Sequence, residues 1–216
     1  MGSTAQIQMP LLGEGVDVWR PVSSRPLGGQ LFLIDVQSIP ETEEWAFAPG
    51  DVVRCVERNF ADGSVHPTAV AQVPEQVETV QRWIEFHDSV LERLESAPDA
   101  VELHLLGYVH RWETRAGIRF GLGSMQPILV RIDGPSVPAV LDGHVEISDG
   151  SLVTTNAHYS NLIPLPLQAS GSVRLILNLP DGRNLDVSGA DCIVEANGVA
   201  RFVEVLPADM YPAEPA

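Results

Sequence analysis

The stretch VELHLLGYVHRWE, residues 101–113, decides the fold, because its side chains alternate as the two faces of a β-strand require. From Val101 onward this period of two continues, and Asp-Gly or Asn-Gly pairs fall between the β-rich runs. These pairs are Asp133-Gly134, Asp142-Gly143, Asp149-Gly150, Asp181-Gly182 and Asn197-Gly198. The pattern predicts an antiparallel β-domain over residues 99–206, built as a meander or a sandwich.

A second region of short strands precedes this domain. Leu31–Ile34 and Val52–Val56 are strand-like runs in a segment that turns often. Its turns fall at Gly28-Gly29, Pro49-Gly50 and Asp62-Gly63. Residues 1–73 are therefore expected to form a small β-domain.

The segment between the two β-regions has a helical period. Val77, Val80, Ile84, His87, Leu91 and Leu94 fall on one stripe. Prolines bracket the segment, and Glu75 and Glu78 lie where the first turn of a helix favours acidic side chains. The spacing predicts one amphipathic helix over residues 74–98, which connects the two β-domains and places His87 at the edge of a core. The fold class expected is mainly β (α+β), with a flexible acidic tail over residues 207–216.

Composition excludes several classes of function. The chain has 216 residues and a formal net charge of −16, so its field repels phosphate backbones and anionic lipid surfaces. Neither nucleic acid nor a membrane is an expected partner. All 13 basic residues are arginine, which excludes Schiff-base chemistry on lysine and a phosphate-binding loop with its lysine.

Cysteine usage and the N-terminal residues predict a cytoplasmic protein. Cys55 and Cys192 lie far apart in strand-like runs, and a chain of this size seldom needs a disulfide. The first residues lack the basic and apolar regions of a secretory signal, and no apolar run approaches the roughly 20 residues that a bilayer requires. Two reduced, buried thiols are expected.

The N-terminal third also resembles a short bacterial module of uncharacterised function. The resemblance lies in LLGEGVDVWRPV, residues 11–22, followed by EEWAF at 43–47 and PGDVVRC at 49–55. Such modules resemble small SH3-like barrels, so the resemblance implies an SH3-like β-barrel over residues 1–73. Trp19 and Trp45 are large enough to close the core of such a barrel.

One strand face carries the first group of candidate ligand-binding residues. In the 101–113 strand, His104, Tyr108, His110 and Trp112 share a face, and Arg111 and Arg119 lie on or near the turn that follows. The face could bind an anionic ligand. The alternative is an ordinary half-exposed sheet face whose aromatic rings pack across strands.

The polar run TTNAHYSN, residues 154–161, supplies the second group. Its candidate ligand-binding residues are Asn156, His158, Tyr159 and Asn161. Binding residues concentrate on loops held by a rigid scaffold, so the run could be a recognition loop. The alternative is a loop whose Asn and Thr side chains satisfy its own backbone.

Catalytic and metal-binding motifs are not recognised. The histidines lack HxH, HxxxH or HExxH spacing, and six residues of strand separate His104 from His110 by roughly 20 Å, too far for shared coordination. No nucleophile elbow is present, and neither cysteine has a histidine near it in sequence. The sequence therefore predicts no metal, no cofactor and no catalytic residue, and it favours a non-enzymatic protein.

Three hypotheses of function follow. The first is a cytoplasmic protein that binds, and neutralises or regulates, a basic protein partner, because an acidic surface speeds the encounter with a basic one. The second is a domain that binds or senses an anionic metabolite or nucleotide. The third is a structural or assembly subunit, a homo-oligomer in which the helix stripe and open sheet edges pair with identical chains.

Overall fold

The computed structural model describes residues 4–73, 78–115, 117–134 and 144–212, and these residues group into two compact units. The first unit comprises Met1–Val80, Glu113–Gly121 and Val205–Ala216. The second comprises Gln81–Trp112 and Leu122–Glu204.

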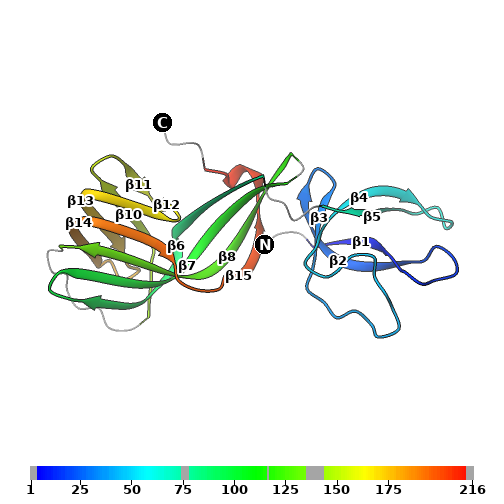
Figure 1. Cartoon of the computed structure of the whole chain (residues 1–216), viewed down its shortest axis with the longest axis horizontal. Coiled ribbons are helices and arrows are strands. Elements are labelled where there is room, and N and C mark those ends of the chain that lie inside the picture. Colours follow the sequence, from blue (N-terminus) through cyan, green and yellow to red (C-terminus); the bar gives the residue numbers. More distant parts are fainter. Residues whose placement is uncertain (1–3, 74–77, 116, 135–143, 213–216) are drawn as a thin grey trace. The chain divides into compact units, whose positions relative to one another are not determined.

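The first unit contains a closed barrel of five strands (Figure 1). Its strands are β1 (Ala5–Pro10), β2 (Trp19–Gly28), β3 (Leu31–Ile34), β4 (Val52–Asn59) and β5 (Val65–Gln72). Consecutive strands pair antiparallel, and β1 pairs parallel with β5 to close the ring. The predicted N-terminal β-domain is confirmed at this level.

The core of the barrel follows from the alternation of its strands. Ile7 and Met9 point inward from β1 and are fully buried, as a period of two requires. Trp45 joins this core with 9% of its surface exposed, whereas Trp19 is only half-buried. The predicted turn at Gly28-Gly29 has positive φ at both glycines, a conformation that favours glycine.

The second unit contains most residues of a ten-stranded sheet, in the order β11-β10-β13-β14-β8-β7-β6-β12, with β15 paired to β8 and β9 paired to β6. Figure 1 shows β13 and β14 side by side within it. The long strands are β6 (Thr79–Ser96), β7 (Ala100–Arg115), β8 (Ile118–Asp133), β13 (Leu167–Asn178) and β14 (Asn184–Ala196). The short strands are β9 (Val145–Glu146), β10 (Asp149–Thr154), β11 (His158–Ser160), β12 (Leu162–Pro164) and β15 (Arg201–Leu206).

The second unit has its own apolar core, to which most of these strands contribute. Fully buried side chains include Ile84 on β6, Leu103 on β7, Val130 on β8 and Leu175 on β13. The strand pairs β10–β11, β10–β13, β12–β6, β13–β14, β14–β8 and β6–β9 are antiparallel. The prediction of an antiparallel β-domain in the C-terminal half is confirmed.

The predicted connector helix is wrong, because the segment forms strand β6. Ile84 and Phe86 are buried two residues apart, and Ser89 and Leu91 are again buried two residues apart. Between these pairs Asp88 has φ of +65°, and β6 changes its partner from β12 to β9. At this irregularity the next buried residue follows after three positions instead of two. The two strand segments are therefore out of phase, and together their buried residues resemble the stripe of an amphipathic helix. Residues 74–77, at the predicted start of the helix, lie outside the described residues.

Both cysteines are buried and free, as expected, with Cys55 in the barrel and Cys192 on β14. Burial raises the pKa of each thiol to about 12. Among the described residues, no helix has the length and hydropathy that a membrane-spanning helix needs. The predicted tail is described only as far as residue 212, and Ala208–Met210 forms a short 3₁₀ helix there.

Candidate functional site

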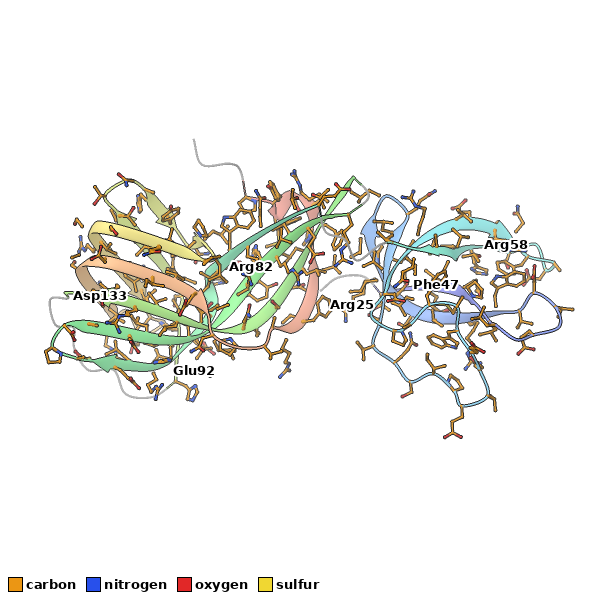
Figure 2. The ribbon with its side chains drawn as sticks, viewed as in Figure 1. Arg25, Phe47, Arg58, Arg82, Glu92 and Asp133 are labelled. Atoms are coloured by element: carbon orange, nitrogen blue, oxygen red, sulfur yellow. The ribbon has the colours of Figure 1, made fainter. Side chains whose placement is uncertain are left out.

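A cleft of about 490 Å³ opens on the N-terminal barrel, and we call it the barrel cleft. Its walls come from the loop between β1 and β2, residues 11–18, from the β3–β4 connection at Ala46 and Phe47, and from β4 and β5. Figure 2 labels Phe47 and Arg58, which come from two of these walls. The loop is anchored at its base, where Leu11 N–H donates to the Val18 carbonyl over 3.0 Å.

Trp19 is the largest aromatic group of the cleft. The Arg58 guanidinium lies 4.0 Å from the centre of its ring, within the range of a cation–π interaction. The same guanidinium lies 3.6 Å from the Asp17 carboxylate. Phe60 meets Trp19 edge-on, with 5.5 Å between the ring centroids. Trp19 therefore contacts both a cation and a second aromatic ring.

The remaining lining combines exposed apolar side chains with two carboxylates. Val16 is 75% exposed and Val70 is 49% exposed, which is high for aliphatic residues at a concave surface. Glu14 and Asp17 line the same cleft and are exposed, Asp17 by 79% of its side chain. The barrel cleft thus offers apolar contact area beside negative charge.

The residues predicted on the strand face lie on β7, and most of them are buried. Tyr108, His110 and Trp112 have 7%, 1% and 2% of their surfaces exposed, while His104 is half-buried. Tyr108 donates from its hydroxyl to Glu204 Oε1 over 2.9 Å, and burial is the main cause that raises the pKa of this phenol. The rings of Tyr108 and His110 meet edge-on at 5.3 Å. These side chains are engaged by groups of the chain itself, and their role in binding a ligand stays a prediction.

Glu85 joins the two predicted groups of residues. Its Oε2 lies 2.7 Å from His110 Nε2, and its Oε1 accepts a hydrogen bond of 3.1 Å from Asn161 Nδ2. The hydrogen bond from His110 is the largest cause that holds the pKa of the Glu85 carboxyl below its usual value. The other ring nitrogen of His110, Nδ1, is buried with no hydrogen-bond partner among the described residues.

Asn161 holds the two ends of the sheet together. It stands between β11 and β12, which are the two terminal strands of the sheet order, and its φ is +59°. Its N–H donates to the Gly150 carbonyl over 2.7 Å, and its own carbonyl accepts from Phe86 N–H over 2.9 Å. Its side-chain oxygen accepts from His87 N–H over 2.7 Å. These contacts connect β10 with β6 through one residue.

His87 is exposed, and its predicted place at the edge of a core is wrong. It lies beside Asp88 in the irregular part of β6, with 57% of its side chain exposed. Its Nδ1 lies 2.7 Å from the carbonyl oxygen of Ser148, and this hydrogen bond, with the charge of Asp88, raises the pKa of the imidazole.

The other predicted residues are dispersed. Asn156 and His158 are exposed, Tyr159 packs against the core of the second unit, and Arg111 is exposed on β7. Arg119 lies in the first unit, with its guanidinium 4.1 Å from the Tyr211 ring centre. The Thr154 hydroxyl accepts hydrogen bonds from the backbone N–H groups of Asn156 and Ala157. The Thr154 N–H donates to the Ala157 carbonyl, which closes a tight turn. This favours the interpretation of residues 154–157 as a loop that satisfies its own backbone.

One cluster of metal-type side chains exists among the described residues. Glu95 on β6 and Glu102 and His104 on β7 place ligand atoms within 4.8 Å of one another. Two arginines already pair with this cluster: Arg93 lies 2.8 Å from Glu95 and 3.3 Å from His104, and Arg131 lies 2.8 Å from Glu102. The cluster is therefore organised as a network of ion pairs. Sequence spacing missed it because one member comes from the neighbouring strand.

Comparison of this chain with family models, with curated proteins and with solved structures finds no match in any of the three.

The barrel cleft itself was missed by sequence reasoning. Arg58, Asp17 and Val70 are far apart in sequence and meet only through the pairing of the barrel strands. One signal was present: Val16 stands between Gly15 and Asp17, three positions before Trp19. An exposed aliphatic residue in a polar loop indicates a contact surface better than it indicates a core.

Proposed function

We propose that this chain is a protein-binding protein that takes a basic segment of a partner into the barrel cleft. The observation that carries the proposal is the lining of that cleft. Glu14 and Asp17 stand beside the exposed Val16 and Val70 and the half-buried Trp19. Such a surface suits a segment in which cationic and apolar side chains alternate.

Charge supports a basic partner over an acidic one. The chain carries a formal net charge of −16, so its field attracts a cationic protein and repels an anionic one. Complementary charge raises the rate of encounter more than it raises the affinity itself. The binding energy then has to come from apolar and aromatic contacts inside the cleft, where tryptophan is a residue type enriched among binding hot spots.

Two finer expectations belong to this proposal. The five-stranded barrel, with its strands paired in chain order, supports an SH3-like assignment for residues 1–73. The two buried, free thiols fit a reducing compartment and so support a cytoplasmic location.

The test is a titration with the peptide acetyl-RVRVR-amide, followed by calorimetry and by chemical shifts of the Trp19 indole. We expect binding that weakens strongly between about 50 mM and about 500 mM salt, because exposed charges are screened over a Debye length. The acidic peptide acetyl-EVEVE-amide should not bind.

A matched pair of variants locates the site. The double substitution Glu14→Gln and Asp17→Asn should weaken peptide binding several-fold. The double substitution Asp191→Asn and Glu195→Gln removes the same charge from exposed positions of β14, in the other unit, and should have little effect. Equal losses in both variants would mean that net charge alone attracts the peptide, and that the barrel cleft is not the site.

A further inference from the structure

The place that Arg58 occupies on the barrel is itself a binding place for a guanidinium group. It is formed by the face of Trp19 and the carboxylate of Asp17, which lie 4.0 Å and 3.6 Å from the Arg58 guanidinium, measured to the ring centre and to Oδ2. The three residues come from β4, from the start of β2 and from the loop before it. An aromatic face beside a carboxylate is the pair of groups that a planar guanidinium recognises best.

Arg58 is bound only weakly by Trp19 and Asp17, because these contacts are exposed to water. Its side chain is 46% exposed and that of Asp17 is 79% exposed. Ion pairs between exposed side chains contribute little to stability, and a cation–π contact at an exposed site is modest. A guanidinium from outside could therefore displace Arg58 at small cost and make the same two contacts.

We infer that Trp19 and Asp17 form an arginine-binding site. Arg58 occupies this site in the free chain, and an arginine side chain of the partner displaces it. This inference rests on the proposed function and narrows it from a basic segment to one that carries arginine. Glu14 and Val16, on the same loop as Asp17, would then meet the residues that flank the partner's arginine.

The inference predicts a preference for arginine over lysine. A lysine ammonium is a strongly hydrated point charge, whereas a guanidinium stacks on an indole and still pairs with a carboxylate in its plane. We expect acetyl-RVRVR-amide to bind more tightly than acetyl-KVKVK-amide at equal salt. Trp19→Leu should abolish this preference, while a folded barrel is verified by circular dichroism.

The decisive variant is Arg58→Met, which keeps an unbranched side chain and removes the competing guanidinium. We expect it to tighten binding of acetyl-RVRVR-amide by about 2- to 5-fold, the size of a contact between exposed groups. Because the substitution also makes the chain more acidic, Arg54→Met is the matched control. Arg54 is exposed on the same strand and has no cation–π contact in the described residues, so its removal should change affinity less.

Every outcome decides between the two proposals. If Arg58→Met weakens binding, or changes it no more than Arg54→Met, the inference is overturned. The proposed function is then still tested separately by the double substitution Glu14→Gln and Asp17→Asn. Equal affinity for the arginine and lysine peptides likewise overturns the inference alone. If neither the wild-type chain nor Arg58→Met binds a basic peptide, both proposals fail.

Discussion

Asn161 and Glu85 are 76 residues apart in sequence and are joined by a hydrogen bond of 3.1 Å between Nδ2 and Oε1. Through this contact the segment between β11 and β12 is tied to β6, and His110 is tied to the same carboxylate. One polar residue from each predicted group, His110 on β7 and Asn161 in the 154–161 run, therefore bonds to the same carboxylate.

Substitution of Asn161 should destabilise the second unit. Asn161→Gly keeps the backbone conformation but removes the two side-chain hydrogen bonds, and we expect a loss of about 1–3 kcal/mol in the free energy of unfolding. Asn161→Ala should cost roughly 1 kcal/mol more, because a φ of +59° disfavours alanine. Urea unfolding followed by circular dichroism measures both. The exposed neighbour Asn156 is the control, and an equal effect of Asn156→Ala would contradict the assignment.

Acid should weaken the second unit through Glu85. Its pKa is lowered in the folded chain, so its contribution to stability is full above the unfolded pKa and is lost as the pH falls through the folded pKa. We expect the advantage of wild type over Glu85→Gln in unfolding free energy to shrink between about pH 6 and about pH 3. Thermal melts of both chains across this range measure it. The comparison cancels the titrating groups that do not interact with Glu85, and a constant difference would refute the prediction.

Both thiols should be inert while the chain is folded. Burial raises the pKa of Cys55 and Cys192 to about 12, so almost no thiolate exists at neutral pH, and the sulfur atoms are also shielded from reagents. We expect no labelling by iodoacetamide in native buffer and labelling of both thiols in guanidinium chloride, measured by mass spectrometry. Rapid labelling of either cysteine in the folded chain would show that its strand opens.

The sequence predicted the structure correctly where a few neighbouring residues determine it. The turns at Gly28-Gly29 and Asp62-Gly63 needed only glycines at positive φ, and the strand Leu31–Ile34 needed only a short apolar run. The helix expected at β6 failed because Asp88 shifts the phase of the strand. A left-handed aspartate leaves no signature in a hydrophobic pattern, so the shift resembles a change of period.

The candidate site was harder to predict, because its residues meet through tertiary contacts. His110 and Asn161 were among the polar residues that the sequence singled out, yet the group that joins them, Glu85, lies in the segment expected to be helical. The barrel cleft has the same character. Arg58 and Trp19 are 39 positions apart by their numbers and meet only when β2 and β4 fold into one ring.

The sheet of the second unit ends in two very short strands, β11 and β12, of three residues each. Exposed strand edges are templates on which further copies of a β-rich chain can grow into aggregates, and short edges offer few backbone groups to such a copy. Because the two strands follow each other directly along the chain, neither can detach far from the other. We expect this layout to disfavour fibrillar self-association at these two ends of the sheet.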